Sequence, residues 1–536
     1  MRARAQGRPN ARPTRARALR RCATAVAAVL LAATACGGGK SAKHPPADGA
    51  SGTPARGGSL TFLLPVDSRA LDPFSAAPVN VADASRLAAI YDPLLLTDAA
   101  TGAVRPHLAE SLTSADNGAT WILKLRPNVT FSDGTPFDAE AVKYTWERHA
   151  DPAVRSLQAA AATGLALTVA DPLTLKIVPP TPNATFDHVA ASALTYIASP
   201  TALRADPAGF AAKPVGAGPF MLTEWVRGDH QTLKRNPKYW QGPDKPYLDQ
   251  VVFKTTPDLL QGMNAVAGGQ ADLTVSVDPG IIAQAKDHGL AVTSLDLHGG
   301  QMLAFNNAKP PFDDPRARRA VSLAIDPAEL NKLIYDGKAT VAHGVLSSAR
   351  LGGARLAPQP GTDKAEAQRL FDELAAAGKP LDFGLLVTQN PTTAKVAEYL
   401  QSRLGTFRNV HMRVDAVAAA QFVPRQQIQR DYQATLTQQW IDDPEPALAQ
   451  LLTSASKQNW LGYANPAVDQ AFAAARATTD PAARTAAFAS VQQALDTDLP
   501  FFVTLTPSTA VLAGGGITGV ALYNDGAVLM DRIGRR

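Results

Sequence analysis

Residues 90–152 read IYDPLLLTDAATGAVRPHLAESLTSADNGATWILKLRPNVTFSDGTPFDAEAVKYTWERHADP and contain the clearest structural signals of the chain. Every second side chain from Trp121 to Leu125 is large and apolar, which is the period of a strand with one buried face. Residues 132–134, Ser-Asp-Gly, then predict a turn. A helix is expected after Asp138, whose carboxylate can cap the first turn. A strand, a turn and a helix in close succession indicate an α/β fold.

Strand and helix signals continue to alternate from Gly58 to the end of the chain. Asp363 and Glu366 have the spacing of a capping box, and Asn465-Pro466 and Asp480-Pro481 are each typical of a helix start. The chain has 536 residues, of which 46% are hydrophobic and 18% charged. This composition predicts a large buried core divided between at least two lobes.

The positive charge of the chain is concentrated at its N-terminus. The formal net charge is +5, yet eight arginines lie in the first 21 residues, so subtracting these leaves −3 for the rest. A mildly acidic body is a poor match for phosphate backbones, and we therefore expect no nucleic-acid partner. The two cysteines are Cys22 and Cys36, so the folded body contains no disulfide and no cysteine zinc site.

The N-terminal segment is typical of an exported protein. After the arginines comes the apolar run Ala23–Ala35, which has the length of a signal-peptide core and is too short to span a bilayer. The export route, general or twin-arginine, stays open. We predict a signal peptide over residues 1–35.

The residues around the predicted cleavage site resemble a bacterial lipobox. Small residues precede Cys36 and three glycines follow it, although Ala33 stands where a lipobox usually has leucine. The resemblance implies that Cys36 is lipidated; the alternative is ordinary cleavage near Ala35, which leaves a free thiol. Residues 36–56 are then expected to be a flexible tether, because they are rich in Gly, Ser, Ala and Pro and show no apolar periodicity.

Motifs for catalysis and for cofactors are missing from the sequence. The nine histidines are scattered without metal-ligand spacing, no GxSxG elbow occurs, and no glycine-rich dinucleotide loop follows a strand. We therefore expect no metal, no cofactor and no catalytic residues, and we interpret the chain as a binding protein rather than an enzyme.

Three blocks of sequence resemble the family 5 extracellular solute-binding proteins, which are the dipeptide, oligopeptide and nickel binders of ABC importers. The first block is residues 90–152, with Tyr91-Asp92-Pro93-Leu94. The second, residues 213–254, contains KPVGAGPF, RNPKYW and YLDQVVFK, and the third is AFNNAKPPFDDPRARRAVSLAID at residues 304–326. The resemblance covers about residues 57 to 510 in the expected order.

This resemblance implies an α/β, two-lobed periplasmic-binding-protein-like fold of the class II type, with an extra subdomain in lobe one. A ligand would be trapped in a cleft between the lobes, a common place for ligand sites. The expected boundaries are residues 57–298 plus 490–536 for lobe one, with the subdomain at about 85–200, and residues 299–489 for lobe two.

One segment carries ligand chemistry in the family: Trp, two small residues, Asp, an aromatic, Pro, Asp, Pro. Here it reads Trp440-Ile441-Asp442-Asp443-Pro444-Glu445-Pro446, one residue shorter and without the aromatic. The resemblance implies that Asp442 pairs with the α-ammonium of a peptide, with Trp440 and Asp443 beside it. The alternative is that Asp442 and Asp443 cap a turn before a helix at Ala447.

Two further ligand contacts are predicted on the strand that leads into lobe two. Phe305 and Asn306 would present backbone and amide groups to an extended peptide. Core packing is the alternative for Phe305. For a ligand carboxylate, Arg425 and Arg430 are only candidates, because no motif matches.

The function implied is that of a lipid-anchored receptor on the extracytoplasmic face of a bacterial cell membrane. It would be a monomer, bind a small solute, in the first place a short peptide, and deliver it to an inner-membrane ABC permease complex. Two alternatives remain. One is a binder of nickel chelates or oligosaccharides on the same fold. The other is a secreted lipoprotein hydrolase with Asp442 and Asp443 as acid and base.

Overall fold

The structure, a computed structural model, describes residues 54–77, 81–351 and 353–536. The predicted signal peptide, Cys36 and most of the predicted tether lie outside the described residues. Among the helices that are described, none is long and apolar enough to cross a membrane.

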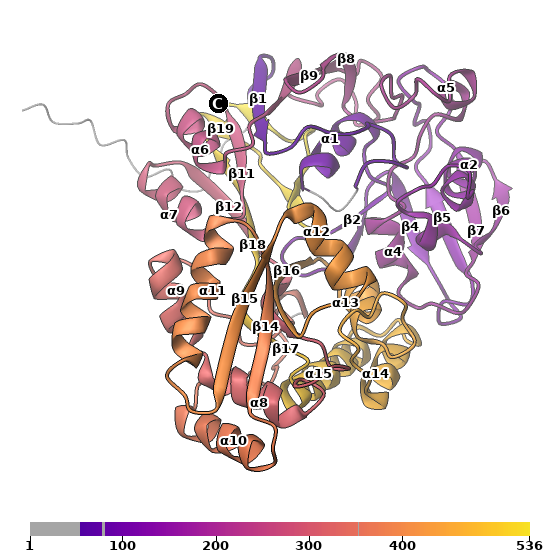
Figure 1. Ribbon diagram of the computed structural model, residues 1–536. Coiled ribbons are helices and arrows are strands. Elements are labelled where there is room, and N and C mark those ends of the chain that lie inside the picture. The colour runs from indigo at the N-terminus through magenta and orange to yellow at the C-terminus, as the bar shows by residue number, and fades with distance from the viewer. Residues whose placement is uncertain (1–53, 78–80, 352) are drawn as a thin grey trace, which may run out of the picture. The chain divides into compact units, whose positions relative to one another are not determined.

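Lobe one is centred on a seven-stranded mixed sheet (Figure 1). The middle strand, β1 (Ser59–Leu64), is parallel to both neighbours, and all other pairings are antiparallel. The order is β12 (Ala291–Asp296), β18 (Ser508–Ala513), β11 (Leu273–Ser276), β1, β10 (Gln250–Thr255), β9 (His230–Arg235) and β8 (Phe220–Val226).

The two faces of this sheet are buried by different helices. Phe62 points into a core shared with α1 (Val81–Tyr91), whereas Leu63 points into a core shared with α6 (Leu259–Ala267) and α7 (Pro279–Asp287). The alternation of side chains along a strand produces this division.

The subdomain of lobe one is a four-stranded sheet in the order β4 (Ala109–Thr113), β5 (Trp121–Leu125), β7 (Thr174–Val178) and β6 (Ala166–Asp171). It packs against α2 (Ala139–Ala150), α3 (Ala159–Ala162) and α4 (Phe186–Ser192) around one apolar core. The predicted strand is β5, and the predicted helix is α2, whose Asp138 carboxylate accepts from the Ala141 N–H at 2.9 Å. Both local predictions are confirmed.

Two of the sequence blocks meet at a buried carboxylate of lobe one. Asp92 accepts from the Tyr239 hydroxyl and the Trp240 indole, each at 2.8 Å, and its other oxygen lies 2.7 Å from His107 Nε2. Gly218 packs so closely against the end of α1 that a Cβ there would lie 2.5 Å from the Ile90 carbonyl carbon. These motifs therefore fix the scaffold of lobe one.

Lobe two contains a five-stranded sheet with helices on both faces (Figure 1). Its order is β15 (Val410–Val417), β14 (Leu381–Thr388), β16 (Ala434–Ile441), β13 (His298–Phe305) and β17 (Phe501–Leu505). One face packs on α8 (Pro315–Ala324), α9 (Pro327–Tyr335), α10 (Lys364–Ala376) and α11 (Pro391–Leu404). The other packs on α13 (Pro444–Leu452), α14 (Pro466–Arg476) and α15 (Pro481–Asp498). The predicted caps Asp363, Asn465 and Asp480 are confirmed.

The chain passes between the two large sheets twice. It leaves lobe one between β12 and β13, near Leu297, and returns between β17 and β18, near Pro507; the Leu297 N–H donates to the Pro507 carbonyl at 3.0 Å. The sheets thus divide the chain near residues 297 and 506. The boundary expected at residue 490 lies within α15.

Short elements complete the fold. They are β2 (Leu95–Thr97), β3 (Val104–Pro106), α5 (Pro200–Ala205), η1 (Ala349–Leu351), α12 (Ala419–Val423), η2 (Pro424–Ile428), β19 (Ile517–Thr518), β20 (Leu522–Tyr523), β21 (Ala527–Val528) and β22 (Gly534–Arg535).

Candidate functional site

The segment predicted to contact the ligand lies where β16 ends and α13 begins. In the antiparallel pairing with β13, Trp440 stands opposite Gly299. Gly299 has φ +100°, and a Cβ there would lie 2.2 Å from the Gln439 carbonyl oxygen. The Trp440 side chain is 44% exposed, which is unusual for so large an apolar group. The Trp440 ring is thus partly open to solvent, two residues before Asp442 in the chain.

Asp442 is buried and already has a charged partner. Its carboxylate pairs with the Arg350 guanidinium, and the two side chains are 9% and 1% exposed. Arg350 Nη2 and Nε also donate to the Asp442 carbonyl at 2.9 and 3.1 Å. Burial raises the pKa of Asp442, and the charge of Arg350 opposes this increase only in part.

Arg350 also connects the two lobes. It lies in η1 of lobe two, and its Nη1 donates at 2.9 Å to the Ala99 carbonyl, in the loop between β2 and β3 of lobe one. The Thr97 hydroxyl of lobe one hydrogen-bonds Asp442. The pair of Arg350 and Asp442 therefore lies at the boundary between the lobes.

Asp443 has a different environment from Asp442. Its Oδ1 accepts from the Glu445 N–H at 2.9 Å, as the N-cap of α13, and from Arg484 Nη2 at 2.8 Å. Its Oδ2 lies 2.9 Å from Nδ1 of His188 in α4 of lobe one. Burial opposes ionisation of this carboxyl, but Arg484 and His188 outweigh burial and hold its pKa far below the usual range. Asp443 caps a helix, as the alternative interpretation expected.

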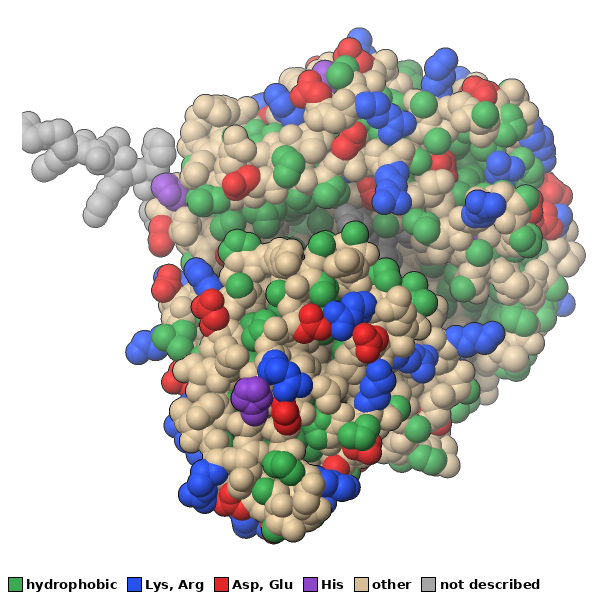
Figure 2. Space-filling view, viewed as in Figure 1, with side chains coloured by type: hydrophobic (Ala, Val, Ile, Leu, Met, Phe, Trp, Pro, Cys, Tyr) green, Lys and Arg blue, Asp and Glu red, His purple; other side chains and the backbone are tan. Residues whose placement is uncertain are grey.

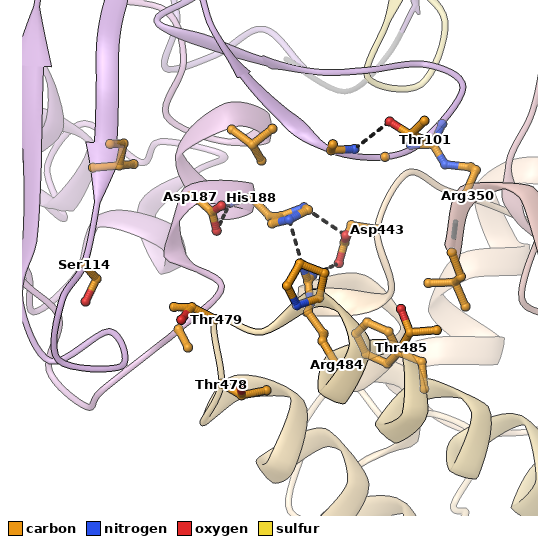
Figure 3. A pocket seen from close by; sticks show the side chains of 18 of the residues that line it. Thr101, Ser114, Asp187, His188, Arg350, Asp443, Thr478, Thr479, Arg484 and Thr485 are labelled. Atoms are coloured by element: carbon orange, nitrogen blue, oxygen red, sulfur yellow. Dashed lines mark hydrogen bonds and ion pairs between the residues drawn. The ribbon is translucent and has the colours of Figure 1, made fainter. Parts of the chain in front are cut away.

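His188, Asp443 and Arg484 form a closed triangle across the lobe boundary, as Figure 3 shows. Arg484 Nη1 donates to His188 Nε2 at 2.6 Å, so this ring nitrogen accepts and the proton of the neutral imidazole is on Nδ1. The pKa of His188 is nevertheless raised. Burial and the charge of Arg484 disfavour the charged ring, but the charge and hydrogen bond of Asp443, together with the charge of Asp187, outweigh them.

The triangle lies at the wall of a cavity of about 450 Å³ between the subdomain of lobe one and helix α15 of lobe two. Its lining combines apolar side chains, among them Trp121 and Phe488, with hydroxyl and guanidinium groups. The polar side chains are those of Thr101, Thr113, Ser114, Asp187, His188, Arg350, Asp443, Thr478, Thr479, Arg484 and Thr485. Elsewhere on the surface, Figure 2 shows a hollow between the part over β8 and β9 and the part over α12.

The other predicted ligand residues lie within lobe two. Phe305 is fully buried in the core, 4.5 Å from the Phe312 ring centroid, and pairs with β16 along one edge. Asn306 Nδ2 donates to the Arg430 and Tyr432 carbonyls at 3.2 and 3.1 Å. The ligand role of Phe305 and Asn306 stays a prediction, as do those of Trp440, Asp442 and Asp443.

The two arginines considered for a ligand carboxylate are engaged elsewhere. Arg425 pairs with Asp415 at 2.8 Å and with Asp431 at 3.3 Å, and Arg430 Nη2 donates to the Lys457 carbonyl at 3.4 Å. The structure places Arg350 beside Asp442 instead. No motif in the sequence indicates Arg350, His188 or Arg484, because each acquires its partners only through tertiary contacts.

Within the ranges that the structure describes, no group of three His, Cys, Asp or Glu side chains could hold a metal ion.

Residues 103–461, about two thirds of the chain, match the model of the bacterial extracellular solute-binding proteins, family 5 Middle. The chain belongs to this family. The family assignment and the two-lobed fold predicted from the sequence are thereby confirmed, and members of such a family act outside the cytoplasm.

A curated relative of this family 5 protein is the glutathione-binding protein GsiB of Shigella dysenteriae, 28% identical over 78% of this chain and 83% of the relative.

Three solved structures share the fold. CtaP of Listeria monocytogenes, an ABC transporter substrate-binding protein, has a TM-score of 0.77 and 20% identity over 90% of this chain and 99% of its own. AppA of Bacillus subtilis, solved with a nonapeptide, has a TM-score of 0.73 and 20% identity, and the match covers 90% of this chain and 100% of AppA. NikZ of Campylobacter jejuni, solved with Ni(L-His), has a TM-score of 0.71 and 20% identity, and the match covers 88% of this chain and 97% of NikZ.

Proposed function

We propose that this family 5 protein captures short peptides between its lobes and delivers them unchanged to an ABC permease in the inner membrane. It acts as a lipid-anchored monomer on the outer face of that membrane. The relatives named for glutathione and the neighbour solved with a nonapeptide support a peptide ligand. The fold supports capture by closure of two lobes.

The observation that carries the proposal is the buried pair of Arg350 and Asp442 at the lobe boundary. A buried guanidinium and a buried carboxylate each require an opposite charge. Without a ligand they neutralise each other. A peptide with free termini brings an ammonium for Asp442 and a carboxylate for Arg350, so the solute can replace both partners without stranding a charge.

Calorimetry with dialanine, trialanine and tetraalanine tests the site, with the N-acetylated peptides as comparison. In a closed cleft, removing one partner of a desolvated pair costs about 2 to 5 kcal/mol, so Asp442→Asn should weaken binding by roughly 30-fold to several thousand-fold. The N-acetylated peptides should bind the wild type poorly and lose little more in the variant.

Asp382→Asn is the matched control, because Asp382 also pairs with an arginine, Arg413, but lies exposed on β14. It should bind the peptides as the wild type does. Equal affinity of the wild type and Asp442→Asn for the free peptides would exclude Asp442 from the ammonium site.

Mass spectrometry of the solute that copurifies with the protein tests the ligand class directly. We expect a peptide, recovered intact. A nickel chelate or an oligosaccharide would contradict the peptide proposal and leave the family assignment in place. A product cleaved over repeated turnovers would favour the hydrolase.

The lipid anchor is tested separately, because Cys36 lies outside the described residues. Two acyl chains anchor a protein stably to a membrane, whereas one chain binds marginally. The wild type should therefore fractionate with membranes, and Cys36→Ser should be released to the medium. A wild-type protein whose intact mass shows no lipid would refute the anchor without affecting the ligand site.

A further inference from the structure

A carboxyl group with one buried and unpartnered oxygen lies at the lobe boundary. Asp525 occupies the turn between β20 and β21, and its Oδ1 is buried and has no hydrogen-bond partner among the residues that the structure describes. A buried polar atom without a partner costs free energy, and a buried unpaired charge costs far more. Such a group in a native fold requires an explanation.

The turn does not depend on the Asp525 side chain for its conformation. The neighbouring Asn524 holds it: Asn524 Oδ1 accepts from the Thr97 N–H at 2.8 Å, and Nδ2 donates to the Ala191 carbonyl at 3.1 Å. Tyr523 precedes Asn524, and its hydroxyl is also held within lobe one. It lies 2.5 Å from the Tyr196 hydroxyl and can donate to the Ala84 carbonyl at 3.3 Å. Lobe one therefore fixes the position of Asp525 through other residues.

Asp525 lies near enough to the pair of Arg350 and Asp442 for their charges to act on its carboxyl. Arg350 is already used, since its three nitrogens donate to Asp442 and to the Ala99 carbonyl. The cluster thus contains two carboxyl groups and only one cationic group, the occupied guanidinium of Arg350.

The protonation state of Asp525 agrees with this deficit. Burial, reinforced by the like charge of Asp442, raises its pKa well above the ordinary value, and Arg350 opposes the increase only weakly. From lobe one, Tyr196 and Tyr523 also face it, and burial raises the pKa of both phenols, so they stay neutral. Burial therefore favours the protonated, neutral form of the Asp525 carboxyl in the ligand-free protein.

We propose that Asp525 is a second carboxylate for the cationic group of the ligand, so that this group is held between Asp525 of lobe one and Asp442 of lobe two. The inference rests on the proposed function and extends it. On binding, the Asp525 carboxyl releases its proton to solvent, and an N–H of the ligand takes its place as the donor to the carboxylate. The site then selects solutes with a protonated amine, and binding releases a proton.

The test compares the wild type with Asp525→Asn by calorimetry with trialanine at neutral pH. The titrations are run in phosphate and in Tris, which have different heats of ionisation. For the wild type, the binding heat should differ between the two buffers in the sense of proton release. Asp525→Asn should bind about 30-fold or more weakly, because Asn offers no charge to the ammonium, and should release no proton. N-acetyl-trialanine should bind the two proteins equally.

Asp496→Asn is the matched control. Asp496 lies in α15, also has a buried oxygen without a hydrogen-bond partner, and has a pKa raised by burial to about 7. Its replacement should leave trialanine affinity and proton release unchanged.

Thermal unfolding of the ligand-free proteins distinguishes a purely structural role of Asp525 from a role in ligand binding. Because Asn removes an acid that has an unpartnered buried oxygen, Asp525→Asn should unfold at or above the wild-type temperature. A lower unfolding temperature would assign Asp525 to the scaffold and overturn the inference. Wild-type affinity and proton release in Asp525→Asn would also overturn it, while leaving the proposed function intact. A wild-type protein that binds none of the alanine peptides would instead reject the proposed function, and this inference with it.

Discussion

Asp442 and Asp443 are adjacent in sequence but have opposite electrostatic character. Both are buried, and burial alone raises the pKa of any carboxyl group. Asp443 has Arg484, His188 and a backbone N–H around it, and its pKa falls. For Asp442, burial is the largest influence, and Arg350, His188 and Thr97 together do not outweigh it, so its pKa rises. The balance between burial and the surrounding cations and donors decides the sign of each shift.

A third carboxyl, Glu445, gives a pH dependence that can be measured. Its side chain is 3% exposed and pairs with Arg476 Nη2 at 2.6 Å, yet burial outweighs this pair and raises its pKa from 4.5 to about 7. Between these two values the folded protein retains a proton that the unfolded chain has lost. Stability contributed by Glu445 should therefore decrease as the pH rises through this window, by up to about 3 kcal/mol.

Glu445→Gln should reduce this decrease, which urea unfolding at about pH 5 and about pH 8 would measure. Glu140→Gln, at an exposed position in the first turn of α2, is the control and should retain the wild-type slope. An unchanged slope in Glu445→Gln would show that another group titrates in this range.

Among the elements, six helices of lobe two begin in the same way. An Asp or Asn caps the helix and a proline follows in the first turn, where its missing N–H costs nothing. These cap positions are Asp314, Asp326, Asn390, Asp443, Asn465 and Asp480. Asp443-Pro444 thus has the same dipeptide pattern that predicted the helices at residues 465 and 480, which is why its capping role can be recognised in the sequence.

Loss of the capping side chain should lower the unfolding free energy by very different amounts at two of these positions. Asp480→Ala removes an exposed cap and should cost about 0.5 to 2 kcal/mol of unfolding free energy. Asp443→Ala also strands Arg484 and His188, both largely buried, and should cost about 3 to 5 kcal/mol. Denaturant unfolding of both variants measures the difference, and equal costs would mean that water solvates Arg484 and His188 after the substitution.

At the scale of the whole molecule, a set of polar contacts among the described residues joins the two lobes. It includes the triangle of His188, Asp443 and Arg484, the bonds from Arg350 to Ala99 and from Thr97 to Asp442, and the Ala184 N–H, which donates to the Arg476 carbonyl at 2.8 Å. Interfaces of this kind permit domain motion. A ligand that touches both lobes then shifts the equilibrium towards the closed state.

His188→Ala should therefore favour the open state of the ligand-free protein. Small-angle scattering should show a larger radius of gyration than for the wild type, and adding a binding peptide should reduce it again. Ser192→Ala is the control, because the Ser192 hydroxyl donates to the His188 carbonyl within α4 and takes no part in the contact with lobe two. The same radius in the wild type and in His188→Ala would mean that the triangle does not control closure.

The sequence by itself determined the local structure and the family. The strand at residues 121–125, the capped helices after Asp138, Asp363, Asn465 and Asp480, and the three family blocks depend on residues close together in the chain, so periodicity and dipeptide patterns reveal them.

The partners of the candidate site were decided only by the tertiary structure. Arg350 and Asp442 are 92 residues apart, and His188 and Arg484 are 296 apart, so no local pattern relates them. Asp525 lies in a turn that is fixed by Asn524, and only the folded chain brings it close enough to Asp442 for the two carboxyl groups to interact. The charge of a single aspartate depends on which distant groups surround it after folding. Burial and Coulomb interactions act through space, and the sequence records only neighbours along the chain.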